Sequence, residues 1–511
     1  MKRLPIGIQS FGKLREGGYL YVDKTREIYQ LVSEAGYYFL SRPRRFGKSL
    51  MISTFKELFS GNKELFKGLW IEDQWDWKTK HPVLHISFSS LGYKSLGLER
   101  ALLELLDEVI EEHGLEVREE SLEKKFREVL ESLSANARVV LLIDEYDKPI
   151  IDYLGEEIEQ ARENQQILKK FYSVIKDSDP WLRFVFITGV SKFSRVSIFS
   201  DLNNLNDITM SPRHSTLLGY TQAELEHFFA DHLRAFGEKS GMSRKEGLSA
   251  IKNWYNGYSW DGREFVYNPF SILLLFYNGV FSNYWFKTAT PTFLVHLIRE
   301  KVYYDFDGIR VGETAFDSFD IEHLNVETIL FQTGYLTIRE YDAKRLLYTL
   351  RYPNKEVKQS MLEYLIDTFS EVEHTRVRSY VLEVEDALQE EDLEKVREIF
   401  NILLYSLPNQ LHQNEERFYH AIVHLFFKYM GLDVHSEVNT SRGRADALVI
   451  LEDKVYCFEF KLNKTAVEAL EQIQARGYLD KYRDSGKKLI AVGVNFSTEK
   501  REVDELLVEV L

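Results

Sequence analysis

The chain contains a single cysteine, Cys457, so no disulfide bond can form within its 511 residues. Chains without disulfides are typical of reducing compartments, where hydrophobic cores supply the stability. Hydrophobic residues make up 44% of the sequence and aromatic residues 14%, which is ample material for such cores. Because one core rarely extends over more than roughly 250–300 residues, we expect two to four domains.

Long apolar runs are missing as well. No window approaches the roughly 18 consecutive apolar residues that indicate a membrane-spanning helix. The opening stretch MKRLPIGIQSFGKL is interrupted by Gly7, Gln9 and Gly12, so it does not resemble a signal-peptide core. We therefore expect a cytoplasmic protein that makes no membrane contact.

Positive charge is in deficit, because 80 Asp and Glu residues outnumber 65 Lys and Arg residues and give a net charge of −15. This balance argues against a protein that coats nucleic acid without sequence preference. It does not exclude a local site for nucleic acid.

A phosphate-binding loop is indicated near residue 47, although one of its usual glycines is missing. The usual pattern is G-x-x-x-x-G-K-[ST], in which backbone N–H groups surround the phosphates, the lysine reaches the outer ones and the hydroxyl ligates magnesium. Here Gly47, Lys48 and Ser49 are in place, but Arg42 occupies the first glycine position. An arginine fits there only in a differently shaped turn, which Pro43 could hold. Taken alone, the three residues favour an ordinary helix start.

A second motif, RVVLLIDEYDKP at residues 138–149, changes this interpretation. It indicates a buried strand ending in Asp144 and Glu145, where an ATPase places a magnesium-orienting carboxylate and a water-activating one. Two adjacent acids could simply mark a strand end, but both motifs in this order favour nucleotide binding. Thr188, at the end of a later strand, could sense the γ-phosphate. Arg195 could reach the negative charge that develops on the phosphates during hydrolysis. A polar loop is an equally good interpretation of Arg195.

The first half of the chain alternates apolar runs with helical stretches. Runs that are apolar throughout indicate strands covered on both faces, and their alternation with helices predicts a parallel α/β sheet. The predicted strands lie at residues 37–40, 83–88, 139–144 and 183–188, with a fifth candidate at 214–221. The fifth candidate leads into a helix that starts with a capping box, Thr221 and Glu224.

The second half contains further units. The pattern predicts aromatic helices over residues 222–300, the order helix, hairpin, helix over residues 321–366, and a charged helical connector over residues 370–404. A last α/β unit begins near residue 408. The expected domains are an ATPase-like domain at 1–221, a helical lid at 222–310, a winged-helix-like and helical connector at 311–404, and a terminal domain at 405–511.

Several segments together resemble one family, the bacterial and archaeal AAA-ATPase-like proteins. They are YVDKT, RPRRFGKSL, LIDEYDKP, SDLNNLNDIT, WYNGY and YNPFSI, in this order within residues 5–290. The resemblance implies that Arg42 belongs to the family's own form of the loop and that residues 17–25 lie near the bound base. It also implies that ATP and Mg²⁺ are bound by the loop residues Arg44, Arg45, Phe46, Gly47, Lys48 and Ser49, with Asp144, Thr188 and Arg195.

The stretch GRADALVILEDKVYCFEFKL at residues 443–462 indicates a second site, because Asp446, Glu459 and Lys461 are the groups that nuclease chemistry uses around a divalent metal. The bare spacing is weak, since it occurs by accident elsewhere in the chain. Here two strands joined by a turn are predicted, and alternation along the second strand places Glu459 and Lys461 on one face. Asp446, at the start of the neighbouring strand, can then converge on them. A cross-strand ion pair is the plainer alternative.

This terminal stretch resembles the PD-(D/E)xK nuclease superfamily over residues 408–508. The resemblance implies that Glu416, on a preceding helix, is a further acid of the site and that Gln472 lies beside it. The proline of the family name is absent, because Ala445 precedes Asp446. His420 is more often a packed helix residue than a ligand, so it is left outside the metal set.

The expected fold is α/β: a P-loop NTPase parallel sheet with a helical lid and a winged-helix-like middle region, followed by a small restriction-endonuclease-like α/β domain. The expected function is an ATPase coupled to a metal-dependent nuclease that acts on nucleic acid, DNA more than RNA, with a possible homo-oligomer. Basic loops at 441–444 and 480–488 are candidate nucleic-acid contacts, although such charges are usually solvated surface. Two alternatives stay open: a signalling or scaffold ATPase whose terminal domain binds without cutting, and a non-catalytic nucleotide switch.

Overall fold

A computed structural model describes most of the chain. The described residues are 1–34, 36–154, 157–192, 199, 202, 204–286, 298, 306–316, 325–370, 374–405, 415–431, 435–436, 439–440, 443–444 and 447–511. At some of these residues the structure describes the backbone alone: 369–370, 374–375, 415–421, 423, 435–436, 439–440 and 443–444. The chain divides into two compact units that meet in sequence at Glu356 and Val357.

The first unit is built on a parallel sheet, which within the described residues has five strands in the order β2-β3-β4-β1-β5. The four strands predicted from apolar runs are confirmed as β1 (Tyr37–Ser41), β2 (Val83–Ser87), β3 (Val139–Asp144) and β4 (Leu182–Gly189). Every residue of β1 and β3 is buried, which explains their unbroken apolar character.

The fifth strand is β5 (Leu205–Asp207), so the prediction of a strand at 214–221 was wrong. That segment follows a short 3₁₀ turn, Pro212–His214, and makes one isolated bridge, from Tyr220 to Tyr267. Gly219 has φ +85°, a left-handed conformation that interrupts extended backbone.

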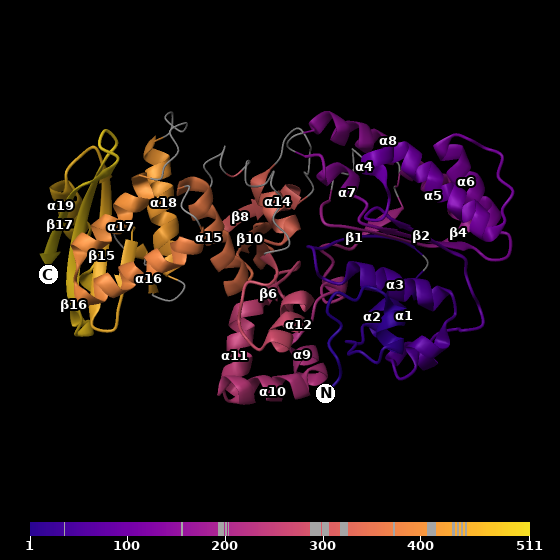
Figure 1. Ribbon diagram of the computed structural model, residues 1–511, viewed down its shortest axis with the longest axis horizontal. Helices are drawn as coiled ribbons and strands as arrows, with labels where there is room; N and C mark the ends of the chain where they lie inside the picture. The colour runs from indigo at the N-terminus through magenta and orange to yellow at the C-terminus, as the bar shows by residue number, and fades with distance from the viewer. Residues whose placement is uncertain are drawn as a thin grey trace. The chain divides into compact units, whose positions relative to one another are not determined.

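Helices cover both faces of this sheet (Figure 1). One face carries α1 (Phe11–Glu16), α2 (Thr25–Ser33) and α3 (Lys48–Phe59). The other carries α5 (Leu98–His113), α6 (Leu122–Leu133), α7 (Lys148–Ile151) and α8 (Ile158–Asp177). Phe55 of α3 packs on Phe184 and Phe186 of β4, with ring centroids 5.3 and 4.9 Å apart. The predicted α/β class is confirmed.

A helical group follows the sheet, made of α9 (Gln222–Phe228), α10 (Ala230–Ser240), α11 (Arg244–Tyr255) and α12 (Pro269–Asn278). The predicted capping box is confirmed, because Thr221 accepts from the backbone of Glu224 and the Glu224 carboxylate accepts in return. Phe229 and Phe236 pack in its core with Leu20 and Val22, so the N-terminal segment is anchored to these helices.

The rest of the first unit contains α14 (Val326–Thr333) and a hairpin of β9 (Thr337–Asp342) and β10 (Leu347–Arg351). The predicted order of helix, hairpin and helix is confirmed, since α15 (Lys355–Ser370) follows. The sheet also includes β8 (Ile309–Gly312), giving the antiparallel order β8-β10-β9. Four residues are too short for the sequence pattern to reveal as a strand.

The second unit places α16 (His374–Glu390), α17 (Leu393–Tyr405), α18 (Glu415–Met430) and α19 (Ala466–Arg476) around a mixed sheet. Its order is β11-β14-β15-β16-β17, and β15 and β16 run parallel. The bounds are His435–Ser436, Ala447–Ile450, Lys454–Leu462, Lys488–Ser497 and Glu502–Val510. The predicted hairpin is confirmed as β14 and β15, which pair antiparallel.

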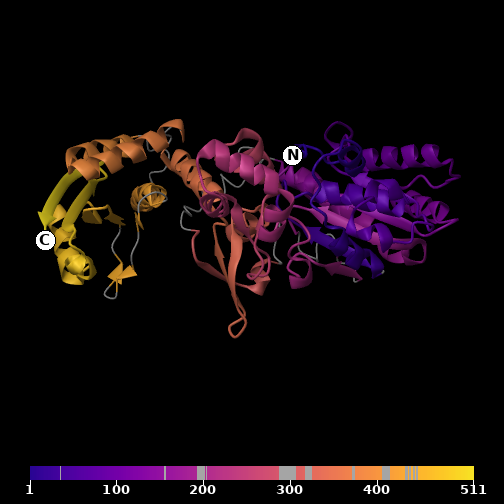
Figure 2. The same cartoon turned by 90° about the horizontal axis from the view of Figure 1, so that it is seen from below.

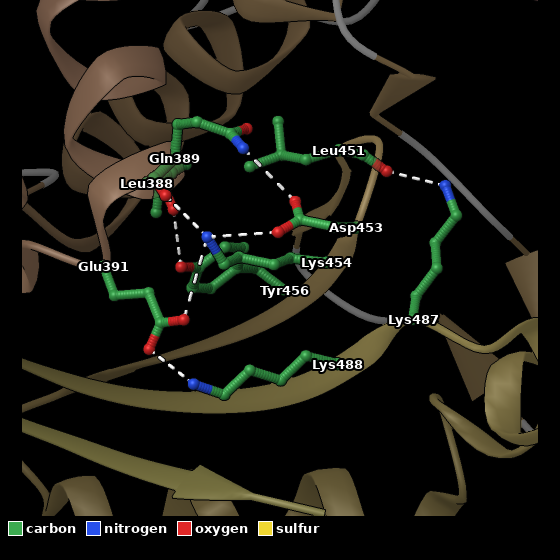
Figure 3. A network of polar contacts seen from close by, with 9 residues as sticks. All are labelled: Leu388, Gln389, Glu391, Leu451, Asp453, Lys454, Tyr456, Lys487 and Lys488. Atoms are coloured by element: carbon green, nitrogen blue, oxygen red, sulfur yellow. Dashed lines mark hydrogen bonds and ion pairs between the residues drawn. The ribbon is translucent and has the colours of Figure 1, made fainter.

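A polar network joins the end of α16 to the strands of the second unit (Figure 3). The Lys454 amine, at the start of β15, donates to the Gln389 carbonyl at 2.6 Å. Glu391 accepts from the Lys488 amine at 2.6 Å. The helices of residues 374–405 therefore pack within the same compact unit as the terminal sheet.

Within the described ranges, every helix is too short or too polar to cross a lipid bilayer.

Candidate functional site

A cavity of about 410 Å³ lies beside the carboxyl ends of β1, β3 and β4, where parallel α/β sheets usually bind ligands. Its polar lining residues include Arg44, Arg45, Gly47, Lys48, Ser49, Glu145, Asp147 and Lys148. Its apolar lining residues include Pro5, Ile8, Tyr220, Phe270 and Leu273. The structure thus brings the loop and the residue after Asp144 to one cavity that charged and apolar residues line together.

The loop adopts a left-handed turn directly before α3. Gly47 has φ +94° and Arg45 has φ +70°, and the space around a Cβ at Gly47 is open. The Lys48 amine donates to the carbonyl oxygens of Arg42 and Pro43 at 2.9 and 3.0 Å, which holds the loop closed upon itself. Burial lowers the pKa of Lys48, while the carboxylates of Asp144 and Glu145 oppose that change.

Arg42, at the missing glycine position, is completely buried. Its guanidinium donates to the carbonyls of Ser41 and Thr209, both at 2.8 Å, and lies 3.9 Å from the centre of the Trp260 ring. Burial lowers the pKa of Arg42 to about 9. The side chain faces the protein interior, so it anchors the loop from behind instead of reaching a ligand.

Three aromatic residues, Tyr258, Trp260 and Trp285, form an aromatic collar behind the loop. Phe46 packs edge-on against Tyr258 and Trp260, with ring centroids 4.9 and 5.4 Å apart. The Trp285 indole donates to the Arg44 carbonyl at 3.0 Å. Phe46, which the resemblance placed among the nucleotide-binding residues, therefore points its buried ring into this collar and away from the cavity.

The acidic pair lies at the end of β3, as the sequence predicted: Asp144 is the last residue of the strand and Glu145 follows it. Asp144 is buried, and one of its carboxylate oxygens accepts from the Thr188 hydroxyl at 2.6 Å, so Thr188 orients it from the neighbouring strand. Glu145 has φ +55°, a strained conformation for this residue that turns its side chain to the cavity wall. Burial raises the pKa of Glu145, and the Lys48 charge opposes the rise. An alcohol oxygen at Ser49 and a carboxylate at Asp144 are the hard oxygen donors that Mg²⁺ prefers.

Asp147 was not among the predicted site residues, yet it lines the cavity and is buried. One of its oxygens accepts from the backbone N–H groups of Val190 and Ser191, at 3.0 and 2.6 Å, and from the Ser191 hydroxyl at 2.6 Å. A Cβ at Gly189 would lie 2.7 Å from Asp147, so glycine permits this approach. The sequence signal that could have revealed Asp147 is its place as the third acid of the segment DEYD, directly after a buried strand.

The N-terminal residues that line the cavity are not those of the segment 17–25, which was expected to lie near the bound base. Pro5, Ile8 and neighbouring residues line the cavity, and no residue of 17–25 does so among the described ones. Lys24 instead donates to Glu224 at 2.8 Å, which ties the N-terminal segment to α9.

Three predicted residues lie outside what the structure describes. Arg195 and Asp446 fall outside the described residues, and Glu416 lies in α18 at a position whose side chain is left out. Their roles remain predictions.

In the second unit, Glu459, Lys461 and Gln472 lie together. The Lys461 amine donates to Glu459 at 2.9 Å and to the Gln472 side-chain oxygen at 2.7 Å, and the Gln472 amide donates to the same Glu459 oxygen. Glu459 is 2% exposed. Ala447, the first described residue of β14, pairs with Phe458, next to Glu459. A carboxylate beside a lysine on one strand suits a divalent metal with a nearby cation.

Gly493 makes this arrangement possible. It pairs with Glu459 across β15 and β16, and a Cβ there would lie 2.3 Å from the Ala466 carbonyl at the start of α19. Without a side chain at residue 493, α19 packs directly onto the sheet and brings Gln472 to Glu459.

The predicted basic loop at 480–488 is largely engaged in contacts of its own unit. Lys487 donates to the Leu451 carbonyl and Lys488 to Glu391, both at 2.6 Å (Figure 3). Arg483 pairs with Asp480 at 3.1 Å. In the other predicted loop, residues 441 and 442 lie outside the described residues.

Comparison with known proteins agrees with both expected domain families. Residues 5–199 match the family described as "Predicted AAA-ATPase", and residues 414–506 match the PD-(D/E)XK nuclease superfamily. A protein of Azotobacter chroococcum mcd 1, described as "Uncharacterized protein in vnfD 5'region", is 42% identical over 525 aligned positions, covering 100% of this chain and 99% of that protein. In outline the two domains support an ATPase joined to a nuclease-like domain. The chain therefore belongs to the AAA-ATPase-like family and carries a C-terminal domain of the PD-(D/E)xK nuclease superfamily.

Proposed function

We propose that this protein binds and hydrolyses ATP in its first unit and cuts nucleic-acid phosphodiesters in its second. The observation that carries the first half is the shared cavity: Lys48, Ser49 and Glu145 line it together with the apolar residues Ile8 and Phe270. A volume of about 410 Å³ lies within the usual range for small-ligand sites. The charged lining residues suit a triphosphate and the apolar ones suit a flat base.

The loop residues would bind the phosphates of ATP, and the acids would orient Mg²⁺ and the attacking water. Gly47 is the N-cap of α3, so the N–H groups at the positive end of that helix can donate to phosphate oxygens. Lys48 would exchange its bonds to two loop carbonyls for bonds to the outer phosphates. Asp144, held by Thr188, and Ser49 would hold Mg²⁺. Glu145 would accept a proton from the attacking water, a role that its raised pKa favours.

The second half of the proposal depends on Glu459, Lys461 and Gln472. Glu459 and Asp446 would hold a divalent metal, with Glu416 near them, and Lys461 would sit beside the attacking water. Gln472 orients both Glu459 and Lys461 through its amide. A bound divalent metal would supply Lewis-acid polarisation of the phosphoryl oxygen at either site. DNA is the substrate proposed first, with RNA as its competitor, and the cytoplasm is the proposed location.

The experiment compares the purified parent with paired variants. Lys48→Ala is expected to lower ATP turnover by about two orders of magnitude or more, because it removes a phosphate-binding cation. Lys56→Ala changes an exposed lysine of the same helix and serves as the control. Glu459→Gln is expected to abolish cleavage of single- and double-stranded DNA and RNA with Mg²⁺ or Mn²⁺, whereas Glu471→Gln, exposed beside Gln472, is expected to keep it.

The alternative of a signalling or scaffold ATPase predicts ATP turnover with no cleavage under any of these conditions. Cleavage that survives in Glu459→Gln would overturn the nuclease assignment. Full ATP turnover in Lys48→Ala would overturn the assignment of the loop, and binding of ATP without turnover in the parent would favour the nucleotide switch.

A further inference from the structure

The hairpin of β9 and β10 has no part in either proposed site. Its tip projects beyond the helices of that unit (Figure 2). The strands β8, β9 and β10 carry Arg310, Arg339 and Arg351 against Glu340 and Asp342, and the turn between β9 and β10 adds Lys344 and Arg345. Five cations and two anions give these strands and their turn a charge of +3, whereas the whole chain carries −15.

The hairpin is stiff. Tyr341 and Tyr348 face each other across the two strands and stack with centroids 4.4 Å apart. Phe316 packs edge-on against Tyr348 at 5.0 Å. Cross-strand aromatic pairs stabilise a hairpin, so the tip is held in one position before any ligand arrives.

The tip itself is preformed. The Asp342 carboxylate accepts from the backbone N–H groups of Lys344 and Arg345, at 3.0 and 3.2 Å, which fixes the turn. Leu346 follows with φ +55°, a conformation that costs free energy for leucine, and its side chain is 60% exposed. Folding alone does not favour an exposed leucine in a strained turn, because glycine or asparagine would fit better.

We propose that this tip is a docking element for duplex DNA, inserted into the major groove with Lys344 and Arg345 on the flanking phosphates and Leu346 against the base edges. The major groove of B-form DNA admits a two-stranded ribbon, and its thymine methyl groups accept apolar contacts. The major groove of duplex RNA is too deep and narrow for side chains to read, so the geometry favours DNA. The proposal rests on the proposed function only in taking nucleic acid as the partner.

The test measures binding of the full-length protein to a short fluorescent DNA duplex, in EDTA so that cleavage cannot interfere. Lys344→Glu with Arg345→Glu is expected to weaken binding at least about tenfold and to flatten the slope of log affinity against log salt by about 2, because two phosphate contacts are lost. Arg234→Glu with Lys245→Glu makes the same charge change on exposed residues of α10 and α11 and is expected to bind like the parent.

Leu346→Gly supplies a second variant that is expected to fold, since glycine favours the left-handed conformation. It is expected to lower affinity for the DNA duplex with an unchanged salt slope, and thermal unfolding checks that all variants remain folded. Equal weakening by both charge-reversed pairs would overturn the proposal, as would unchanged binding by the hairpin pair or no binding by the parent. Equal or tighter binding of an RNA duplex would overturn the groove assignment. If DNA binding depends on the hairpin but the parent cuts no nucleic acid when Mg²⁺ is supplied, the docking proposal is supported and the proposed nuclease activity is refuted.

Discussion

Restoring the standard phosphate loop with Arg42→Gly is expected to damage this protein. Position 42 does not need glycine for its backbone, because among the loop residues the positive φ angles fall at Arg45 and Gly47. The arginine side chain is what joins the loop to Thr209 and to Trp260 of the aromatic collar. Glycine would keep the turn and remove its anchor.

The magnitude follows from the contacts of Arg42. Its two bonds at 2.8 Å, to Ser41 and Thr209, are charge-assisted and contribute about 1.5–3 kcal/mol each, and the contact with Trp260 adds about 2 kcal/mol. Burial lowers the pKa of Arg42 to about 9, which corresponds to a desolvation cost of about 5 kcal/mol. The net contribution is therefore small, about 0–3 kcal/mol, but glycine would also leave a void and carbonyl groups without donors. We expect a net loss of about 2–5 kcal/mol in the free energy of unfolding.

Thermal unfolding and ATP titration measure this effect. Arg42→Gly is expected to lower the unfolding temperature of the first unit by at least about 4 °C and to weaken ATP binding, because the loop loses its fixed position. Arg118→Gly, at an exposed loop residue, is the matched control and is expected to stay within about 0.5 kcal/mol of the parent. Unchanged stability with equal or tighter ATP binding in Arg42→Gly would refute the reasoning.

Three further predictions concern other residues. Burial raises the pKa of Glu356 to about 7, so the folded state binds a proton more tightly than the unfolded state and stability falls as pH rises from about 4.5 to 7. Thermal unfolding of Glu356→Gln between pH 5 and 8 should lack this decline of about 3 kcal/mol, and an identical pH profile would contradict it. Gly493→Ala should cost about 1–3 kcal/mol and reduce cleavage, because a Cβ would lie 2.3 Å from the Ala466 carbonyl, whereas Gly247→Ala, with open space around it, should not destabilise. Equal unfolding temperatures for the two alanine variants would count against this view. Glu145→Gln should bind ATP but hydrolyse it at least about a hundredfold more slowly, and undiminished turnover would remove Glu145 from the role of base.

Much of the fold could be predicted because its signals are local. Four strands of the parallel sheet were visible as apolar runs, and the hairpin of β14 and β15 was visible as two runs joined by a short turn. The fifth strand was missed because three residues, Leu205–Asp207, carry too little pattern, while Leu217 and Leu218 are apolar for a different reason. They are buried beside Gly219, whose left-handed turn ends any extended run.

The candidate sites were only partly visible for the same reason. Lys48, Glu145, Glu459 and Lys461 belong to short motifs, so their types and spacing pointed to phosphate and metal chemistry. Asp147, by contrast, is recognised only by its three hydrogen bonds to Val190 and Ser191, which lie more than forty residues away. A contact of that kind leaves no spacing rule in one sequence.

The sequence by itself determined the parallel α/β class, the order of the two matched domains and the residue types of both candidate sites, because apolar periodicity and short motifs act over a few neighbouring residues. Only the tertiary structure decided where Arg42 and Phe46 point, which N-terminal residues line the cavity, and why Gly493 lies opposite Glu459. Those outcomes depend on packing between segments distant in the chain, and close packing selects among side-chain directions that local sequence leaves equivalent.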